Sequence, residues 1–283
     1  MEKVKLNNGV EMPILGFGVM QIMGAECETA VLNAIEAGYR LFDTAELYGN
    51  EQAIGNAIKG SGVPREELFI TTKFGSKEAG YEKTMAAFQR SLEALQLEYI
   101  DLYLIHQPFG DIFGSWRAMQ ELYNAGKIKA IGVCNFLPDR LMDLISNSGF
   151  TPAVNQIETH PFNQQHETQQ FLKDNNVQIE AWGPFAEGMN GVFTNDVLAA
   201  IGAKYNKTVA QVILRWLTQR KVVAIPKSVR KERMIENISI FDFKLTDEDM
   251  NSIQTLDTKQ SLLFSHRDPV IVKWMSEYGW LKG

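Results

Sequence analysis

Short runs of apolar residues alternate along the chain with longer segments in which apolar positions recur at helical spacing. The short runs, such as IDLYLI and KAIGV, are apolar nearly throughout, which is typical of parallel strands covered on both faces. The expected strands lie at residues 14–18, 40–43, 68–73, 99–106, 128–134, 153–158, 178–183 and 222–226. The expected helices lie near residues 27–37, 50–60, 81–95, 115–125, 138–146, 166–176, 195–219 and 231–238.

This alternation predicts a fold of the α/β class. Strands that alternate with helices pair in parallel through right-handed crossovers. Eight strand–helix units within about 250 residues fit a closed (β/α)8 TIM barrel better than an open sheet. No linker rich in Gly, Ser or Pro divides the chain, so residues 1–283 are expected to form a single barrel domain.

Two further segments flank the eight units. VKL and VEM surround Asn8-Gly9, a dipeptide that favours the type I′ turn of a β-hairpin. Because this hairpin precedes the first barrel strand, we expect it to cap the bottom of the barrel. The tail beyond residue 257 is expected to run beside the last helix and to reach the open mouth.

The composition of the chain excludes several classes of function. Apolar residues make up 45% of the chain and charged residues 22%, which is ordinary for a globular protein. The net charge of −6 argues against general binding to nucleic acid or to anionic membranes. The chain has two cysteines without a CxxC motif, no signal-peptide core and no apolar run long enough to span a membrane. We therefore expect a cytoplasmic protein with no metal site and no nucleic-acid or membrane partner.

Polar side chains follow three neighbouring strands at the points where the strands end. Asp43 closes the second run, Lys73 the third and His106 the fourth, and Tyr48 lies in the loop after Asp43. Each residue alone has an ordinary interpretation, as a helix cap, a solvated lysine, a core histidine or a packing tyrosine. In a TIM barrel, however, the carboxyl ends of the strands and the following loops form the active site, so these four side chains should meet.

The four residues have complementary proton chemistry. A free phenol has a pKa near ~10, too high for efficient proton transfer at neutral pH. The ammonium of Lys73 should lower the pKa of Tyr48, and the carboxylate of Asp43 should keep Lys73 charged and fixed. An imidazole at the same place can donate a hydrogen bond to a substrate oxygen. The group is therefore expected to deliver a proton to a carbonyl.

The segments FDTAELYGNE, ITTK and DLYLIH are similar to the motifs of the aldo-keto reductase family, and the resemblance covers essentially the whole chain. It implies that Asp43, Tyr48, Lys73 and His106 form a catalytic tetrad, with Tyr48 as the general acid. It also implies hydride transfer from NADPH to a small aldehyde or ketone, in an enzyme that is a monomer. Carbonyl reduction needs such a cofactor because side chains cannot supply a hydride.

The chain offers one clear anion site, in the segment IPKSVRKERMIEN. A Rossmann fingerprint is absent, because the GFG of residues 16–18 lacks the third glycine. Two basic residues open the helix after the eighth strand, and the free N–H groups and positive dipole of that helix end attract phosphate. A solvated, charged helix is the ordinary alternative. The resemblance implies that the 2′-phosphate and adenine of NADPH lie here, with contacts from Lys227, Ser228, Val229, Arg230, Arg233, Glu236 and Asn237.

By the same resemblance, the nicotinamide would sit on strands five to seven. VCNF and AVNQIE supply Asn135 and Gln156 for its carboxamide, and AWGPF supplies Trp182 for stacking, with Gly183 beside it. Cys134 and Gly183 stand where the family more often has serine, so two hydroxyl contacts are missing. Candidate walls of the substrate pocket are Met20, Gln21, Gln107, Phe109, Trp116, Phe264 and His266. The sequence does not choose among a small aldehyde, an α-dicarbonyl and a keto sugar.

Three other functions are compatible with part of the pattern. A hydrolase with two carboxylates would use Glu158 with Glu46 or Glu187, and glycosidase chemistry needs the two groups to face each other across a cleft. A metal-dependent hydrolase needs clustered ligands, whereas the four histidines lie on different units. A cofactor-binding regulatory subunit of the same family, with little turnover, stays open because it would share both fold and cofactor.

Overall fold

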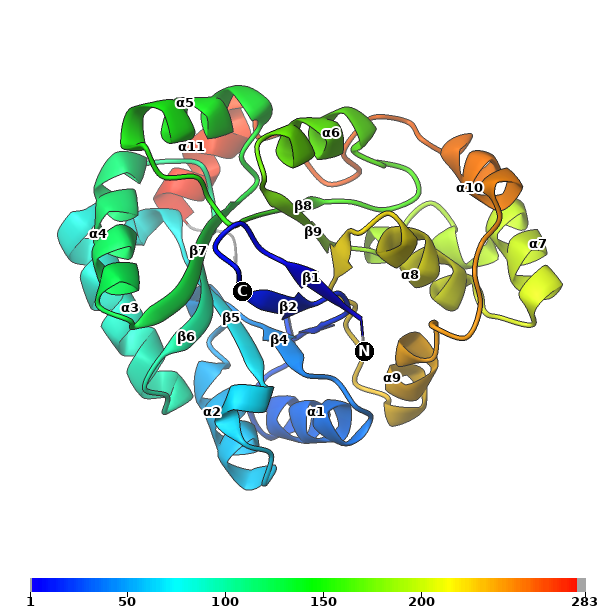
Figure 1. The fold of residues 1–283 in the computed structure, drawn as a ribbon, viewed down its shortest axis with the longest axis horizontal. Coiled ribbons are helices and arrows are strands. Elements are labelled where there is room, and N and C mark those ends of the chain that lie inside the picture. The colour runs from blue at the N-terminus through cyan, green and yellow to red at the C-terminus, as the bar shows by residue number, and fades with distance from the viewer. Residues whose placement is uncertain (1, 279–283) are drawn as a thin grey trace.

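The computed structural model describes residues 2–278 and contains eight parallel strands curled around one axis, with helices outside them (Figure 1). The order of the sheet follows the chain, so each strand pairs with the next one in sequence. The strands are β3 Phe17–Gly18, β4 Leu41–Asp43, β5 Phe69–Phe74, β6 Ile100–Ile105, β7 Ile128–Cys134, β8 Val154–Glu158, β9 Gln178–Trp182 and β10 Val223–Ala224. Each overlaps its predicted range.

The first and last strands close the sheet into a barrel. Leu15 pairs in parallel with Ala224, and the amide of Gly16 donates to the carbonyl of Ala224 at 2.8 Å. A side chain at Gly18 would meet the carbonyl oxygen of Ile225 at 2.9 Å, so glycine permits the two strands to approach. The predicted (β/α)8 barrel is therefore confirmed.

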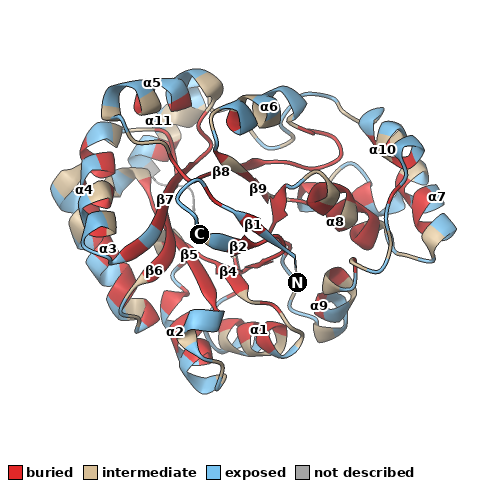
Figure 2. Ribbon diagram, viewed as in Figure 1, coloured by how far each residue is buried: buried red, intermediate tan, exposed pale blue. Residues whose placement is uncertain are grey.

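Helices cover the outside of the barrel and bury one face each against it, as the colouring of Figure 2 shows. They are α1 Gly24–Glu36, α2 Glu51–Gly60, α3 Tyr81–Leu95, α4 Ile112–Asn124, α5 Pro138–Ser148, α6 His166–Asp174, α7 Asp196–Tyr205, α8 Val209–Gln219, α9 Lys231–Ile238, α10 Asp247–Gln254 and α11 Pro269–Tyr278. The prediction of one helix at 195–219 is wrong, because this segment forms α7 and α8. Asn206 ends α7 in the left-handed conformation, and the hydroxyl of Thr208 caps α8.

The pattern of apolar positions does not predict α10 or α11. The sequence signal for α10 is its start, where Thr246 and Asp249 form a capping box. The helix is only eight residues long and buries little apolar surface, chiefly Ile253, so its periodicity is weak. Capping chemistry therefore marks this helix better than hydrophobic spacing does.

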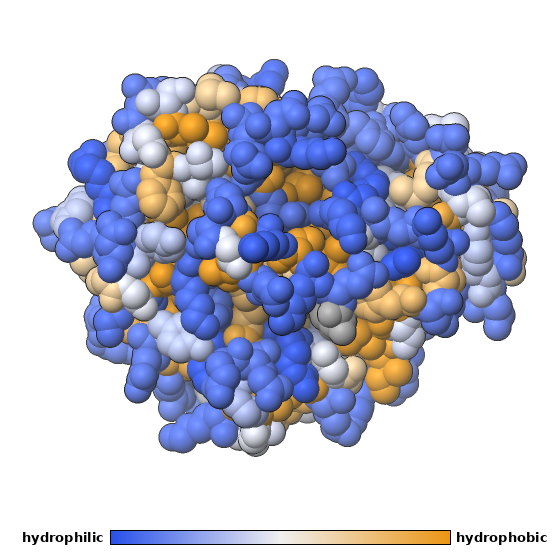
Figure 3. All heavy atoms as spheres, viewed as in Figure 1, coloured by the Kyte–Doolittle hydropathy of each residue, from blue (hydrophilic) through white to orange (hydrophobic). Residues whose placement is uncertain are grey.

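A hairpin covers the bottom of the barrel. β1 Lys3–Lys5 and β2 Glu11–Pro13 pair in antiparallel fashion in front of the barrel in Figure 1, as predicted. Val4, Leu6 and Met12 pack into the apolar cluster that fills the barrel interior. Figure 3 shows this bottom face, on which polar side chains prevail over scattered apolar ones. The opposite end is the mouth, where the C-terminal ends of the strands lie.

The tail after α10 passes the mouth before it enters α11. The hydroxyl of Ser261 and the amide of Leu262 donate to the carboxylate of Glu158, at the end of β8, at 2.5 and 3.0 Å. These bonds hold the tail near the mouth, as the sequence predicts, and residues 279–283 lie outside the described part. Within residues 2–278, no helix is both long enough and apolar enough to cross a membrane.

Candidate active site

Four residues singled out by the sequence meet at the mouth of the barrel. Asp43 ends β4, Lys73 lies in β5, His106 follows β6, and Tyr48 lies in a short 3-10 turn after β4. The Nζ of Lys73 lies 2.5 Å from Oδ1 of Asp43 and also donates to the carbonyl of Thr44 at 2.8 Å. Both charged side chains are buried, and an isolated charge would be costly there, so each depends on the other.

Tyr48 and His106 lie beside this ion pair. The Nζ of Lys73 is 5.2 Å from the centre of the Tyr48 ring. The rings of Tyr48 and His106 meet edge to face, with their centres 5.8 Å apart. Both side chains line a cavity of about 660 Å³, whereas Lys73 is fully buried behind it. A phenol and an imidazole therefore face the same open space.

Burial and charge set the protonation of the phenol. Burial alone would lower the pKa of Lys73, but the neighbouring Asp43 and Tyr48 raise it above the ordinary lysine value. For Tyr48, burial raises the pKa to about 12, and the charge of Lys73 opposes this rise only in part. The prediction of a phenol pKa below its ordinary value is therefore wrong, because desolvation disfavours phenolate more than the ammonium favours it. Tyr48 is protonated at neutral pH and can donate.

His106 is a neutral imidazole near pH 7. Burial lowers its pKa well below the ordinary histidine value, and the charges of Lys73 and His266 lower it further. Its buried Nδ1 has no hydrogen-bond partner among the described residues. A neutral imidazole carries one N–H, which suits the orientation of a carbonyl oxygen.

Residues on β8 and at the ends of β7 and β9 line the same cavity, among them Asn135, Gln156, Trp182 and Gly183. The side-chain nitrogen of Asn135 donates to the carbonyl of His106 at 3.1 Å, and its oxygen accepts from the indole N–H of Trp182 at 2.8 Å. Asn135 thereby ties the indole to the segment that carries His106. The ring of Phe264, from the tail, is stacked near Trp182 with centres 6.4 Å apart.

The amide of Gln156 is turned into the barrel. Its Nε2 donates to Oδ2 of Asp43 at 2.9 Å and to Oε2 of Glu180 at 3.0 Å. Among the described residues, its Oε1 receives only a long contact from the thiol of Cys134, at 3.9 Å. The oxygen of Gln156 therefore remains available as an acceptor at the cavity. This arrangement fits the carboxamide of a nicotinamide, which offers an N–H₂ donor.

The predicted anion site reaches the cavity through two cations. Lys227 and Arg233 line the cavity, and the Nζ of Lys227 donates to Oε1 of Gln21 at 3.2 Å. The proton-donating residues and these cations thus border one continuous space. Such a space suits an extended molecule with a nicotinamide at one end and a phosphate at the other.

The rest of that segment lies beside the cavity rather than in its wall. The hydroxyl of Ser228 accepts from the amide of Arg230 at 3.1 Å, which closes a tight turn before α9. Val229 is exposed and Asn237 is buried. The carboxylate of Glu236 accepts from the hydroxyl that caps α8, at 2.7 Å. Their contacts with a cofactor stay predictions.

A hydrogen bond links one wall residue of the cavity, Gln107, to His266 of the tail. Oε1 of Gln107 lies 3.0 Å from Nε2 of His266, so the imidazole donates to the amide oxygen. The His266 ring also stacks near Phe109, with centres 6.2 Å apart. Gln107 is nearly fully buried and lines the cavity. Its amide hydrogens have no bonded partner within residues 2–278 and can bind a group in the cavity.

Four of the expected wall residues do not line this cavity. Three of them, Phe109, Phe264 and His266, line other cavities beside it, and the fourth is Trp116. Met20 and Gln21 line the cavity, as the sequence suggests. Trp116 does not, because α4 places its indole in the core, fully buried and edge to face with Phe150. Its position as a pocket wall is therefore a wrong prediction.

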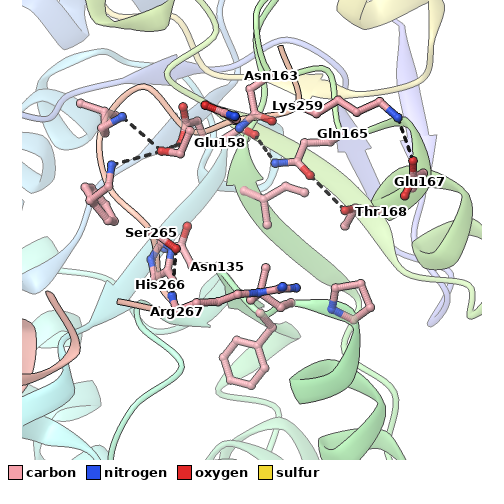
Figure 4. A pocket seen from close by; sticks show the side chains of 18 of the residues that line it. Asn135, Glu158, Asn163, Gln165, Glu167, Thr168, Lys259, Ser265, His266 and Arg267 are labelled. Carbon is pink, nitrogen blue, oxygen red and sulfur yellow. Dashed lines mark hydrogen bonds and ion pairs between the residues drawn. The ribbon is translucent and has the colours of Figure 1, made fainter. Parts of the chain in front are cut away.

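The tail also forms part of the wall of a second cavity, of about 750 Å³. Figure 4 shows Glu158, Gln165 and Lys259 on one side of this cavity, with His266 and Arg267 across from them. Dashed lines mark the bonds that hold its rim, such as the ion pair between Lys259 and a glutamate at the start of α6. The hydrogen bonds from Ser261 and Leu262 to Glu158 hold the tail at the edge of this second cavity.

The arrangement of carboxylates does not favour a glycosidase. Glu158 borders the second cavity and Glu187 borders the first, so the two do not face each other across one cleft. Glu46 is paired with Arg90 at 2.7 Å. Within the part of the chain that the structure describes, no group of three or more His, Cys, Asp or Glu side chains is placed to hold a metal ion.

The sequence prediction omits one buried group, Glu180. It lies in β9 two residues before Trp182 and is the register partner of Gln156 on β8. It is fully buried in the barrel interior. The sequence does carry a signal for it, because residues two apart on a strand share a face, and Glu180 lies two residues before Trp182.

Known proteins resemble this chain along most of its length. The sequence model of the Aldo/keto reductase family matches residues 14–258. The glyoxal reductase of Bacillus subtilis (strain 168) is 50% identical over 258 residues, which are 90% of this chain and 93% of that protein. The crystal structure of MGS-M4, an aldo-keto reductase enzyme from a Medee basin deep-sea metagenome library, has a TM-score of 0.92 at 45% identity and covers 94% of this chain and 98% of its own. The Bombyx mori aldo-keto reductase (AKR2E4), solved in complex with NADP, has a TM-score of 0.88 at 34% identity and covers 96% of each chain.

Proposed function

The chain belongs to the aldo/keto reductase family, and from this membership we propose that it reduces small aldehydes and ketones to alcohols with NADPH. The observation that carries the proposal is one cavity bordered by Asp43, Tyr48 and His106, with Lys73 bonded to Asp43 behind it. Residues 1–283 then act as one barrel domain with a single active site.

Tyr48 is the general acid of the proposed reaction. NADPH, when bound, supplies the hydride that no side chain can supply. The hydroxyl of Tyr48 donates its proton to the carbonyl oxygen, and the ammonium of Lys73, 5.2 Å from the ring centre, stabilises the phenolate that remains. The neutral imidazole of His106 donates to the same oxygen and orients it. Asp43 acts through Lys73, which it keeps charged and in place.

The cavity can hold NADPH in an extended form. When NADPH is bound, the oxygen of Gln156 and the side chain of Asn135 would hold the carboxamide, and Trp182, beside Gly183, would supply stacking to the nicotinamide. The bound NADP of the Bombyx mori relative supports the choice of this dinucleotide. The residues of the anion segment that would hold the 2′-phosphate and adenine are Lys227, Ser228, Val229, Arg230, Arg233, Glu236 and Asn237.

A spectrophotometric assay tests the function directly. Purified protein is mixed with NADPH and with methylglyoxal, glyceraldehyde or a nitrobenzaldehyde, and the absorbance of reduced nicotinamide is followed. Substrate-dependent loss of this absorbance supports the reductase. Tight NADPH binding without turnover of any carbonyl would favour the regulatory-subunit alternative. Absence of NADPH binding would contradict the assignment of the cavity.

Arg233→Ala is expected to lower kcat/KM with NADPH by about 10- to 100-fold, because it removes charge-assisted bonds to the 2′-phosphate. The value with NADH, which lacks this phosphate, should change little. Lys231→Ala is the matched control, since Lys231 lies on the same helix but pairs with Glu36 at 2.7 Å, away from the cavity. An unchanged ratio of the two kcat/KM values in Arg233→Ala would show that the phosphate lies elsewhere.

We further propose an α-oxoaldehyde, such as glyoxal or methylglyoxal, as the substrate class. The related Bacillus subtilis protein is a glyoxal reductase, which supports this choice. Gln107 adds a physical reason, because it lines the cavity and His266 holds its oxygen at 3.0 Å, which leaves its amide hydrogens to bind substrate. An amide donor near His106 can bind the second carbonyl oxygen of a dicarbonyl.

Gln107→Leu is expected to raise KM for methylglyoxal by about tenfold, which corresponds to the loss of one hydrogen bond in a buried site. KM for 4-nitrobenzaldehyde, which has no second carbonyl, should change much less. Both constants are measured with the same protein preparation, so a general loss of folding is excluded. Equal changes for the two substrates would mean that Gln107 only shapes the pocket.

A further inference from the structure

A buried carboxyl lies under the tetrad, and none of the residues 2–278 forms an ion pair with it. Glu180 is fully buried, and its Oε2 accepts from Gln156 at 3.0 Å. Its Oε1 has no hydrogen-bond partner among the residues that the structure describes. An under-bonded carboxyl is unfavourable in a barrel interior, where an apolar side chain would pack without this penalty. Because this cost is not offset by its own contacts, we expect Glu180 to have a functional role.

Gln156 links this carboxyl to the tetrad. Its Nε2 donates to Oδ2 of Asp43 at 2.9 Å and to Glu180, so two carboxyl groups take up its two amide hydrogens. Because both hydrogens are taken up by these carboxyl groups, Oε1 is the part of the amide left to accept from a group in the cavity that Gln156 lines. If the acceptor on Glu180 were absent, one hydrogen would lose its partner and the amide could turn over.

We propose that Glu180 is a positioning residue: together with Asp43 it fixes the amide of Gln156 so that the Gln156 oxygen faces the carboxamide of the nicotinamide. The inference rests on the proposed function, because it gives Glu180 a task only if a nicotinamide lies at this place. Glu180 itself contacts neither substrate nor cofactor. It acts through Gln156 in the way that Asp43 acts through Lys73.

The surroundings of Glu180 keep it uncharged at pH 7. Burial and the charge of Asp43 raise the pKa of Glu180 to about 8, and Gln156 and Lys73 oppose this rise. The other neighbours add no cation, since Gln156 is its register partner on β8 and an apolar residue, Val223, is its partner on β10. The Cys134 thiol nearby is also neutral, because burial raises its pKa. An uncharged Glu180 accepts a hydrogen bond from Gln156 but does not attract the ammonium of Lys73 away from the carboxylate of Asp43.

Two variants separate positioning from mere packing. Glu180→Gln keeps an acceptor oxygen and should bind NADPH as the wild-type protein does. Glu180→Leu removes the acceptor and should weaken NADPH binding by about tenfold, the loss that accompanies one misplaced hydrogen bond. The dissociation constants are measured by quenching of tryptophan fluorescence, with folding checked by circular dichroism. Equal affinity of the folded Glu180→Leu and Glu180→Gln variants would overturn the proposal.

The pH dependence of binding gives a second readout, which does not need the leucine variant. When Glu180 ionises, its negative charge favours the cationic nicotinamide of NADP⁺ over the neutral one of NADPH. In a Tyr48→Phe background, which removes the tetrad phenol, the ratio of the two dissociation constants should shift toward NADP⁺ as pH rises through about 8. Adding Glu180→Gln should abolish this shift, whereas Glu51→Gln, at a buried glutamate bonded to Thr72 at 2.6 Å, should leave it intact.

A shift that survives Glu180→Gln would overturn the assignment, and so would one that disappears in Glu51→Gln. Both results differ from a failure of the proposed function. If the cofactor did not bind in this cavity, the Tyr48→Phe protein with native Glu180 would bind neither NADPH nor NADP⁺, and if only turnover were absent, the ratio could still be measured.

Discussion

Tyr48→Phe is expected to lower kcat by about 10²- to 10⁴-fold, the contribution of a positioned general acid. Phenylalanine keeps the ring that meets His106 edge to face at 5.8 Å and removes only the hydroxyl. NADPH affinity should hardly change, because no contact to the cofactor is assigned to this hydroxyl. Steady-state kinetics with methylglyoxal and a fluorescence titration with NADPH measure the two quantities on one preparation.

Tyr103→Phe is the matched control for this result. Tyr103 is fully buried in β6, and its hydroxyl has no hydrogen-bond partner within the described residues. Its ring packs against Phe88 of α3, on the helix side of the barrel, with centres 5.3 Å apart. Removing that hydroxyl should leave kcat unchanged. Near-normal turnover in Tyr48→Phe, with Tyr103→Phe equally active, would remove Tyr48 as the proton donor.

Lys73→Met is expected to abolish turnover and to reduce the free energy of unfolding by about 3–5 kcal/mol at pH 7. The loss of stability arises because Asp43 remains buried, 2.9 Å from Gln156, without its positive partner. Burial raises the pKa of Asp43, and without Lys73 it rises further, above the value in the unfolded chain. The penalty should therefore be present at neutral pH and shrink as pH falls through the folded-state pKa, where Asp43 takes up a proton. Urea denaturation at several pH values measures it.

The double variant Asp43→Asn with Lys73→Met separates stability from catalysis. It removes both charges, so most of the lost unfolding free energy should return at pH 7. Turnover should stay absent, because no ammonium remains to stabilise the phenolate of Tyr48. A double variant as unstable as Lys73→Met would show that the lysine matters for packing, and recovery of activity would contradict its place in the tetrad.

Much of the site follows from sequence because barrel topology converts chain order into position. Asp43, Lys73 and His106 end consecutive strands, so their meeting follows once eight strand–helix units are recognised. The pKa of Tyr48 does not follow in this way. Its direction depends on how much water surrounds the phenol, and that quantity comes from side chains of several strands and from the turn after β4.

Other features are not predicted from the sequence, because their signals are confined to one or two residues or depend on residues of other strands. The break between α7 and α8 is set by Asn206 and Thr208, two capping residues inside a continuous amphipathic pattern. Glu180 is not predicted because the role of a single glutamate in an apolar strand becomes visible only beside Gln156 and Asp43, which come from other strands. The monomeric state and the cytoplasmic location depend on surfaces and surroundings outside the barrel, and they stay predictions.

The pairing between the first and the last strand of the barrel determines when the barrel can close during folding. The bond from Gly16 to Ala224 joins the two ends of the barrel sequence, so a chain emerging from the ribosome cannot shut the ring until β10 has been made. Until then the first strand keeps an open edge, which is the kind of surface that aggregates. Gln21 and Lys227 lie on either side of this closure and are joined by a hydrogen bond, and a dinucleotide bound as proposed would bridge the same two segments. In a cell depleted of NADPH, the barrel of newly made chains would therefore stay open for longer and be exposed to proteases.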